Sequence, residues 1–279
     1  MTVTDRDARS LYLDQMRRDL TRYGLDQLVP VGWPLGMRAS ASWLLGIPVV
    51  KIRDFILVRK RPFDKRARDL GQDWPADAET MIGMTRLTSL QECVETVLTE
   101  DVPGDLVECG IWRGGACILM RAVLAAYGDE KRSVWLCDSF EGVPPPDTEN
   151  YEEDKVPWYA MGLHRAAPVL AVTQAEVKAN FERYGLLDDQ VRFLPGWFKD
   201  TLADAPIDQI AVLRLDGDLY ESTIQALDAL YPRLSPGGYC IIDDYNLEGC
   251  RQAVADYREK HAISAEIVDI DGTGVLWRK

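Results

Sequence analysis

The feature that most restricts the fold of this chain is a regular alternation of amphipathic helix patterns and short apolar runs, which begins near residue 86. Apolar residues recur at three- and four-residue spacing over 86–99, and this spacing predicts a helix. The patterns that follow are, in order, strand 105–109, helix 114–127, strand 133–138, helix 173–184, strand 191–194, strand 210–215, helix 219–231, strand 239–243 and helix 247–261. Strands that alternate with helices predict a mostly parallel sheet with helices on both faces.

Two apolar runs near the end of the chain, 265–270 and 274–277, flank Asp271-Gly272-Thr273. A short polar turn containing glycine between two such runs is typical of a β-hairpin. We therefore expect an α/β fold with a doubly wound, mostly parallel sheet, to which the terminal hairpin adds antiparallel pairing.

The N-terminal part of the chain is organised differently and reads as an accessory segment. Helical spacing of apolar residues predicts a helix over 5–23, and residues 27–50 are apolar with interspersed Pro and Gly. Residues 51–68 carry eight basic residues against two acidic ones. Such a run fits a solvated linker or helix face, a subunit contact, or a clamp for an anionic group of the substrate.

Composition and charge exclude several classes of function. The 279 residues are 47% hydrophobic, which supports a sizeable core, and the net charge of −13 disfavours nucleic-acid binding. Six cysteines without a CxxC pair indicate reduced thiols. The first ten residues lack the pattern of a signal peptide, and the longest uncharged stretch, 39–50, is too short to span a bilayer. We expect a cytoplasmic protein with no membrane span and no nucleic-acid partner.

The first predicted strand runs into a glycine-rich turn that opens a helix. Glu108 and Cys109 precede Gly110, and Gly114 and Gly115 follow at the start of the helix. Glycines allow a tight turn and a close backbone approach, and a helix N-terminus attracts a carboxylate or a phosphate. The spacing differs from the G-x-G-x-x-G of dinucleotide-binding proteins, and an ordinary strand-to-helix turn would also use glycine.

Two further strand ends fit a nucleoside ligand. Asp138 ends the second strand, where α/β nucleotide-binding proteins hold a ribose diol, although an Asx-turn or a helix cap is an alternative. Trp197 and Phe198 follow Gly196 after the third strand and are candidates to line an adenine pocket or to pack in the core. A nucleoside without a pyrophosphate is indicated, and S-adenosylmethionine fits that description.

Four carboxylates follow the last two parallel strands. Asp216 and Asp218 come after strand 210–215, and Asp243 and Asp244 come after strand 239–243. Neighbouring carboxylates repel one another unless one is protonated or a cation lies among them. Aspartate oxygens suit Mg²⁺ or Ca²⁺, and no Cys or His is near in sequence to indicate zinc. Asp218 also has the form of a helix cap together with Glu221, three residues later.

Taken together, these motifs resemble the macrocin-type O-methyltransferases, a divalent-metal-dependent family that methylates sugar hydroxyls of glycosylated natural products. The resemblance runs from about Thr80 to the C-terminus and rests on segments in the same order, namely 80–83, 86–87, 107–115, 138–144, 196–198, 215–220 and 243–245. It implies a Rossmann-like class I methyltransferase with a seven-stranded sheet. Residues 79–279 would be the S-adenosylmethionine-dependent domain, and residues 1–78 a helical extension that acts as an acceptor lid.

The resemblance also implies which residues hold the cofactor. Contacts to its methionine end are expected from Thr80, Met81, Glu108, Gly110, Ile111, Trp112, Arg113, Gly114 and Gly115. The ribose contact is expected from Asp138, with Ser139 beside it, and the adenine contact from Trp197 and Phe198. We also count Asp216 among the residues that contact the cofactor.

The same resemblance implies a metal site and a base. Its metal ligands would be Asp216, Asp243 and Asp244, and Asp218 matches the proposed general base. A branch of the family uses a histidine near this place, but neither His164 nor His261 falls in the motif, which favours Asp218. A hydroxyl on a divalent ion is far more acidic than a free one, so the metal would do much of the deprotonation.

We therefore predict an S-adenosylmethionine- and Mg²⁺-dependent O-methyltransferase that acts on a sugar hydroxyl of a glycoside, glycolipid or polysaccharide. The alternatives are a metal-dependent O-methyltransferase of catechol-like small molecules and a non-catalytic nucleoside-binding protein. The family also implies a homodimer or higher homo-oligomer, with residues 33–50 as the expected contact. The acidic loop 144–159 is interpreted either as a lid or as a surface excursion.

Overall fold

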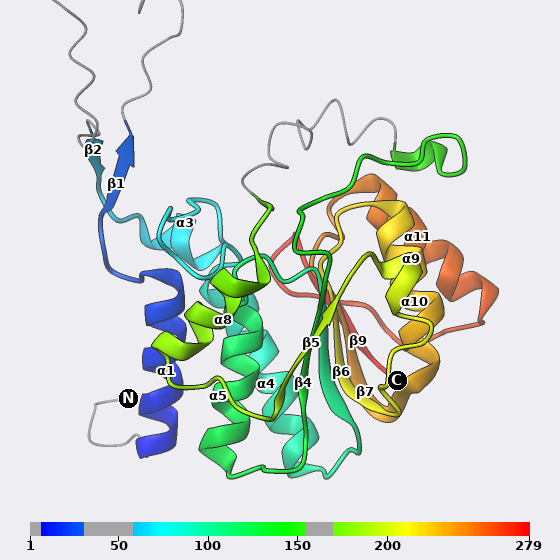
Figure 1. The fold of residues 1–279 in the computed structure, drawn as a ribbon, viewed down its shortest axis with the longest axis horizontal. Coiled ribbons are helices and arrows are strands. Elements are labelled where there is room, and N and C mark those ends of the chain that lie inside the picture. The colour runs from blue at the N-terminus through cyan, green and yellow to red at the C-terminus, as the bar shows by residue number, and fades with distance from the viewer. Residues whose placement is uncertain (1–6, 31–57, 155–169) are drawn as a thin grey trace, which may run out of the picture.

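A seven-stranded sheet with helices on both faces forms the centre of the protein (Figure 1). The structure is a computed structural model that describes residues 7–30, 58–154 and 170–279. The strand order is β5-β4-β3-β6-β7-β9-β8. The strands are β3 (Asp105–Cys109), β4 (Val134–Asp138), β5 (Val191–Pro195), β6 (Ile210–Leu215), β7 (Leu234–Ile242), β8 (Val268–Asp269) and β9 (Val275–Arg278). The first five in this order are parallel, and β9 and β8 add the antiparallel pairing that the sequence predicts.

The helices form one layer on each face of the sheet (Figure 1). One layer contains α1 (Ala8–Thr21), α4 (Met84–Thr99), α5 (Gly115–Tyr127) and α8 (Gln174–Arg183). The other contains α9 (Phe198–Thr201), α10 (Tyr220–Leu230) and α11 (Glu248–Lys260). Short helical turns are α3 (Lys65–Asp69) and the 3₁₀ segments η2 (Glu152–Asp154) and η3 (Tyr231–Arg233). A separate buried apolar cluster lies under each layer.

The central strands are apolar on both faces because helices cover both faces. Every residue of β6 is buried, as expected for a strand in the middle of a parallel sheet. The largest difference from the predicted bounds is in β7, which begins at Leu234 and not at Tyr239. The intervening Ser-Pro-Gly-Gly has the composition of a turn, but the β6–β7 register shifts there, between Ile210 and Val212. The irregular pairing accommodates the Pro and the two Gly.

The order of the strands decides where a ligand binds. The chain passes from β3 to β4 and β5 on one side, and then returns to place β6 and β7 on the other side of β3. Cys109 at the end of β3 is in register with Leu215 of β6, and Leu215 is in register with Ile242 of β7. Ligands of open α/β sheets bind beyond the carboxyl ends of the strands at such a switch point.

A buried ionic contact and a hydrogen bond hold the described N-terminal residues against one another. β1 (Gln27–Pro30) and β2 (Val58–Arg61) pair with each other as a small antiparallel sheet. Arg68, the last residue of the basic run, is buried, lies 2.9 Å from an Asp73 oxygen, and donates to the Thr21 carbonyl at 2.7 Å. At least this basic residue therefore holds the end of α1 in place. The predicted subunit contact over 33–50 lies outside the described residues, as do 51–57 and 155–159.

Glu79 joins α1 to the helix that follows the glycine-rich turn. Its buried carboxylate accepts hydrogen bonds from Arg22, Arg183 and the Tyr184 hydroxyl, each at 2.8 Å. Its backbone carbonyl accepts from the Gly115 N–H at 3.1 Å. The first turn of α5 is thus tied to the N-terminal segment. Within the described ranges, none of the helices is both long and apolar enough to cross a membrane.

Candidate active site

A cavity of about 870 Å³ opens at the carboxyl ends of the parallel strands. Most of the residues singled out in the sequence line it: Thr80, Met81, Glu108, Gly110, Ile111, Trp112, Gly115, Asp138, Ser139, Trp197, Phe198, Asp216, Asp218, Asp243 and Asp244. The volume is within the range of sites that enclose a cofactor-sized molecule. Residues from distant parts of the sequence therefore meet at one place.

Arg113 and Gly114 do not line the cavity. The Arg113 guanidinium donates to the carbonyls of Ala76 and Ala78, at 2.7 and 2.8 Å, and so holds the preceding loop against the turn. Gly114 is the N-cap of α5 in the left-handed conformation, with φ of 84°. The structure thus places these two residues behind the turn, on the side away from the cavity lining.

The glycine-rich turn brings the ends of β3 and β6 unusually close together. Gly110 has φ of +81°, and a Cβ there would stand 1.7 Å from the carbonyl oxygen of Asp216. A Cβ on Gly115 would stand 2.6 Å from the carbonyl oxygen of Glu79. Only glycine fits at these positions. The two glycines therefore allow the backbone of this turn to pack directly against the carbonyl groups of Asp216 and Glu79.

Asp138 is held rigidly at the end of β4. One of its oxygens accepts from the Ile111 N–H at 2.8 Å and the other from the Phe140 N–H at 2.6 Å. Burial raises the pKa of Asp138, and these backbone hydrogen bonds oppose the change. Each carboxylate oxygen has a second lone pair, so the side chain can still accept from a diol.

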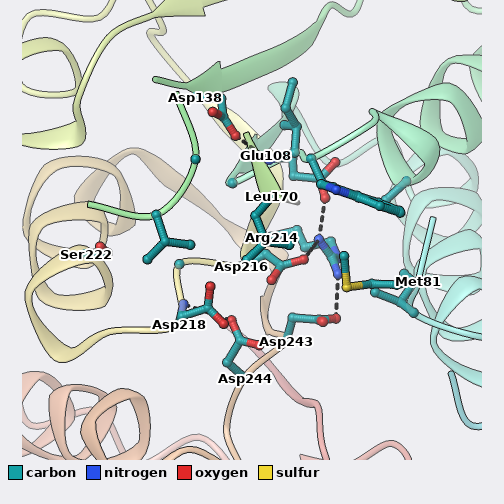
Figure 2. Close-up of a pocket in the computed structure, with 18 of the residues that line it drawn as sticks. Met81, Glu108, Asp138, Leu170, Arg214, Asp216, Asp218, Ser222, Asp243 and Asp244 are labelled. Carbon is teal, nitrogen blue, oxygen red and sulfur yellow. Dashed lines mark hydrogen bonds and ion pairs between the residues drawn. The ribbon is translucent and has the colours of Figure 1, made fainter. Parts of the chain in front are cut away.

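Four carboxylates, which we call the acidic cluster, gather at the other end of the cavity: Asp216, Asp218, Asp243 and Asp244 (Figure 2). One oxygen each from Asp216, Asp243 and Asp244 lies within 4.8 Å of the other two. Asp218, which directly precedes the N-cap of α10, donates its N–H to an Asp244 oxygen at 3.0 Å. The three aspartates present the hard oxygen donors that Mg²⁺ prefers.

Burial and the repulsion of neighbouring carboxylates oppose ionisation of Asp216, Asp218 and Asp244. The pKa of Asp218 is raised to about 7, first by burial and then by the charges of Asp216 and Asp243. The pKa of Asp216 is raised for the same reasons, and that of Asp244 is raised well above its usual range. A divalent cation would relieve this repulsion, so the donor set fits a metal ion both in geometry and in charge.

Two buried arginines compensate part of this charge. Arg214 contacts Glu108, lies 2.9 Å from an Asp216 oxygen and lies 2.5 Å from an Asp243 oxygen (Figure 2). Arg86 from α4 contacts the other Asp243 oxygen. Glu108 also accepts a hydrogen bond from the Cys117 thiol at 2.7 Å. Arg214 thus connects the glycine-rich turn with the acidic cluster.

Asp218 is not the cap of α10. The N-cap of this helix is Leu219, and no side chain of the N-cap residue bonds to the helix. Asp218 itself has φ of 61°, an unusual conformation for a residue other than glycine. The sequence alternative in which Asp218 and Glu221 form a local cap is therefore wrong, and the Asp218 carboxylate is left to face the cavity.

With this geometry in place, comparison with known proteins decides the family. Residues 9–279 match the macrocin O-methyltransferase (TylF) family. The chain belongs to this family. It is therefore an O-methyltransferase, with S-adenosylmethionine as the methyl donor.

Individual macrocin O-methyltransferase relatives match from 80% to 98% of the chain. The 8-demethyl-8-(2,3-dimethoxy-alpha-L-rhamnosyl)-tetracenomycin-C 4'-O-methyltransferase of Streptomyces olivaceus is 53% identical over 98% of this chain and 94% of that protein. The mycinamicin III 3''-O-methyltransferase of Micromonospora griseorubida is 52% identical over 80% and 87%. The structure of the O-methyltransferase NovP is 45% identical, with a TM-score of 0.79 over 97% and 99% of the two chains. The predicted class I methyltransferase fold is confirmed.

The sequence interpretation assigned no role in the site to either arginine, although Arg86 lies in a segment that carries the family resemblance. Arg214 interrupts an otherwise apolar strand, and a charged residue in a strand buried on both faces signals a buried ion pair. That signal was present in the sequence. Arg86 gives no such signal, because its helix position becomes part of the site only when α4 packs beside the end of β7.

Proposed function

We propose that the protein is an S-adenosylmethionine- and Mg²⁺-dependent O-methyltransferase that acts on a sugar hydroxyl of a glycoside, glycolipid or polysaccharide. The observation that carries the metal dependence is the set of three aspartate oxygens within 4.8 Å of one another beside the cavity. The sugar acceptor is supported by the names of the relatives, which methylate a rhamnosyl group of a tetracenomycin and the 3'' position of a mycinamicin.

The cavity lining divides into regions that would hold different parts of the cofactor. Thr80, Met81 and Glu108 would hold its methionine end against the glycine-rich turn, since Glu108 offers a buried carboxylate for the cofactor ammonium group. Asp138 would accept from the ribose diol. The rings of Trp197, which is the N-cap of α9, and of Phe198 would cover the adenine. At the opposite end, Asp216, Asp243 and Asp244 would ligate the metal ion.

Asp218, the proposed proton acceptor, lines the cavity beside the proposed metal ligands. When bound, the cofactor supplies an electrophilic methyl group, and the divalent ion supplies a Lewis acid that lowers the pKa of a sugar hydroxyl. Asp218 takes the proton from that hydroxyl. Burial, the first cause of its raised pKa, makes it a stronger base than an exposed aspartate. Arg214 fixes the distance between Glu108 and Asp216, which sets the approach of the acceptor to the methyl group.

Several parts of the proposal concern the protein beyond this site. We propose that residues 1–78 form the acceptor-side extension of a methyltransferase domain over 79–279, and that the protein is a cytoplasmic homo-oligomer. The identity of the acceptor is left at the level of a carbohydrate, because acceptor pockets in this fold come from variable loops.

Calorimetry and a methyl-transfer assay test the proposal separately. S-adenosylhomocysteine should bind the wild-type protein, and Mg²⁺ should bind in its presence; no binding of S-adenosylhomocysteine would contradict methyl transfer. An alkyl rhamnoside should be methylated, and EDTA should stop the reaction. Methylation of a catechol in preference to the rhamnoside would favour the alternative acceptor class.

A pair of variants tests the base. Asp218→Asn should lower turnover about a hundredfold, because it removes the proton acceptor, while binding of S-adenosylhomocysteine is retained. The exposed Asp204, changed to Asn, is the matched control and should leave both quantities unchanged. Near-wild-type turnover of Asp218→Asn with Mg²⁺ present would mean that another group accepts the proton.

A further inference from the structure

Asp154 caps a helix that lies far from it in sequence. The first amides of a helix have no partner within the helix, and α10 has Leu219 as its N-cap, whose side chain cannot accept a hydrogen bond. Asp154 is fully buried, and its two oxygens accept from the Tyr220 N–H at 2.6 Å and from the Glu221 N–H at 3.0 Å. A carboxylate at this end of a helix is also favoured by the helix dipole.

The surroundings of Asp154 are shaped for its carboxylate. Gly249 in the first turns of α11 faces it, and a Cβ there would stand 3.0 Å from the Asp154 oxygen and 3.3 Å from the Tyr220 nitrogen. The ring of Tyr151 packs against that of Tyr220, with centroids 5.9 Å apart. Two helices and the η2 segment therefore hold this acid at the start of α10 (Figure 1).

The contact between Asp154 and the start of α10 joins two parts of the active site. Val143, Pro144, Pro145 and Asp147 line the same cavity as the glycine-rich turn, so this stretch of loop forms part of its wall. On the α10 side of this contact, Asp218 lies directly before the N-cap of the helix and also lines the cavity. Aspartate is itself a strong helix-capping residue, and Asp218 is close enough in sequence to act as one. Asp154 occupies the position that Asp218 would otherwise fill.

We propose that Asp154 is a positioning residue for the methyl-transfer reaction: it caps α10 in place of Asp218, and so keeps the Asp218 carboxylate turned to the cavity. This rests on the proposed role of Asp218 as the base. In the absence of the Asp154 carboxylate, the amides of Tyr220 and Glu221 recruit Asp218, and the base leaves the acceptor hydroxyl.

Asp154→Asn is the sharpest perturbation, because it keeps the shape of the side chain and leaves one oxygen acceptor for two amides. Turnover (kcat) should fall about tenfold or more, whereas the KM for S-adenosylmethionine and the calorimetric Kd of S-adenosylhomocysteine should change less than about threefold. The exposed neighbour Glu153, changed to Gln, is the matched control and should keep wild-type values. Unchanged kcat in Asp154→Asn would overturn the proposal.

A double-mutant cycle separates a positioning role from a general loss of structure. If Asp154 acts through Asp218, Asp154→Asn should cost almost nothing further in the Asp218→Asn background. An equal fold loss in both backgrounds would overturn the proposal and leave the base assignment intact. Wild-type turnover of Asp218→Asn alone would instead overturn the base assignment, and the positioning role with it.

Gly249→Ala provides a second route in case Asp154→Asn does not fold. The added methyl group meets the Asp154 oxygen at 3.0 Å and has to displace the carboxylate by a few tenths of an ångström. We expect a smaller loss of kcat in the same direction, again absent in the Asp218→Asn background. Full retention of kcat in a folded Gly249→Ala protein whose Asp154 is shown by crystallography to be displaced would overturn the proposal.

Discussion

Replacing Arg214 by Met should destabilise the protein strongly, because it removes the cation that the buried Glu108 and Asp243 and the half-buried Asp216 share. The guanidinium is 1% exposed and contacts Glu108, Asp216 and Asp243. Asp243 retains its contact with Arg86, so two of the three acids lose their cation. Leaving a buried charge without its partner costs about 3–5 kcal/mol, which corresponds to a fall in Tm of about 10 °C for a domain of this size.

The loss of unfolding free energy in Arg214→Met should depend on pH, because the pKa of Glu108 depends on Arg214. Burial raises the pKa of Glu108 to about 7, while Arg214 opposes this rise. Without Arg214 the pKa rises further, so Glu108 of the variant keeps at pH 8 a proton that the wild type has largely lost, whereas at pH 5.5 Glu108 is protonated in both proteins. At pH 8 the folded variant therefore still binds a proton that its unfolded chain has lost, and its stability falls with rising pH at up to about 1.4 kcal/mol per unit for that proton. The destabilisation should therefore be larger at pH 8 than at pH 5.5.

Urea unfolding at these two pH values, in EDTA, measures the effect. The matched control is Arg121→Met, which removes an arginine that faces one carboxylate, Asp188, whose side chain is 44% exposed. Because Arg121 and its backbone hydrogen bonds lower the pKa of Asp188, this pair stays ionised at both values. The control should cost about 1 kcal/mol independently of pH. Equal costs for the two variants, or a larger cost for Arg214→Met at pH 5.5, would refute the reasoning.

Three further predictions follow from the same geometry. Mg²⁺ at a hundred times its Kd should raise the unfolding free energy of the wild type by about 2.7 kcal/mol, and by clearly less in Asp244→Asn, as measured in urea. The metal-free wild type should lose stability as the pH rises from about 4.5 to 7, because Glu108 and Asp218 have raised pKa values of about 7 and lose protons that the folded state favours; a rise in urea midpoint over that range would contradict this. Gly110→Ala should cost more than about 3 kcal/mol, since its Cβ would meet a carbonyl oxygen at 1.7 Å, whereas Gly128→Ala, also at positive φ but with open space, should cost about 1 kcal/mol by thermal unfolding.

Much of the fold could be predicted because it depends on local patterns. Runs of apolar residues give the parallel strands within a residue or so, and α8 begins at a capping box of Thr173 and Glu176 that is visible in the sequence. The bounds fail where pairing overrides composition, as at the irregular start of β7. The short helix α9 was also missed, since it begins at Phe198, within a segment whose aromatics were interpreted as pocket or core residues.

The acids of the site could be located from the sequence because parallel strands end at one edge of the sheet. The residues that contact these acids, and the residue that caps α10, could not be located in this way. Arg86 reaches Asp243 across 157 positions, and Asp154 reaches α10 across 66. No periodicity or spacing encodes such contacts, which depend on how separate elements pack. The alternative in which Asp218 caps α10 could be rejected only when the structure showed which residue is the N-cap of this helix.

Glu79 also determines where this chain can be recombined with a relative. Its buried carboxylate accepts hydrogen bonds from Arg22 on one side of a crossover and from Arg183 and Tyr184 on the other, and its carbonyl accepts from the Gly115 amide. In a chimaera joined just before Glu79, Glu79 comes from this chain, and the arginine that donates to it at position 22 has to come from the relative. If the relative has no arginine at position 22, Glu79 loses this hydrogen bond, and the first turn of α5, which bonds to the Glu79 carbonyl, is held less firmly. Exchanging N-terminal segments to alter acceptor choice requires that these residues travel together.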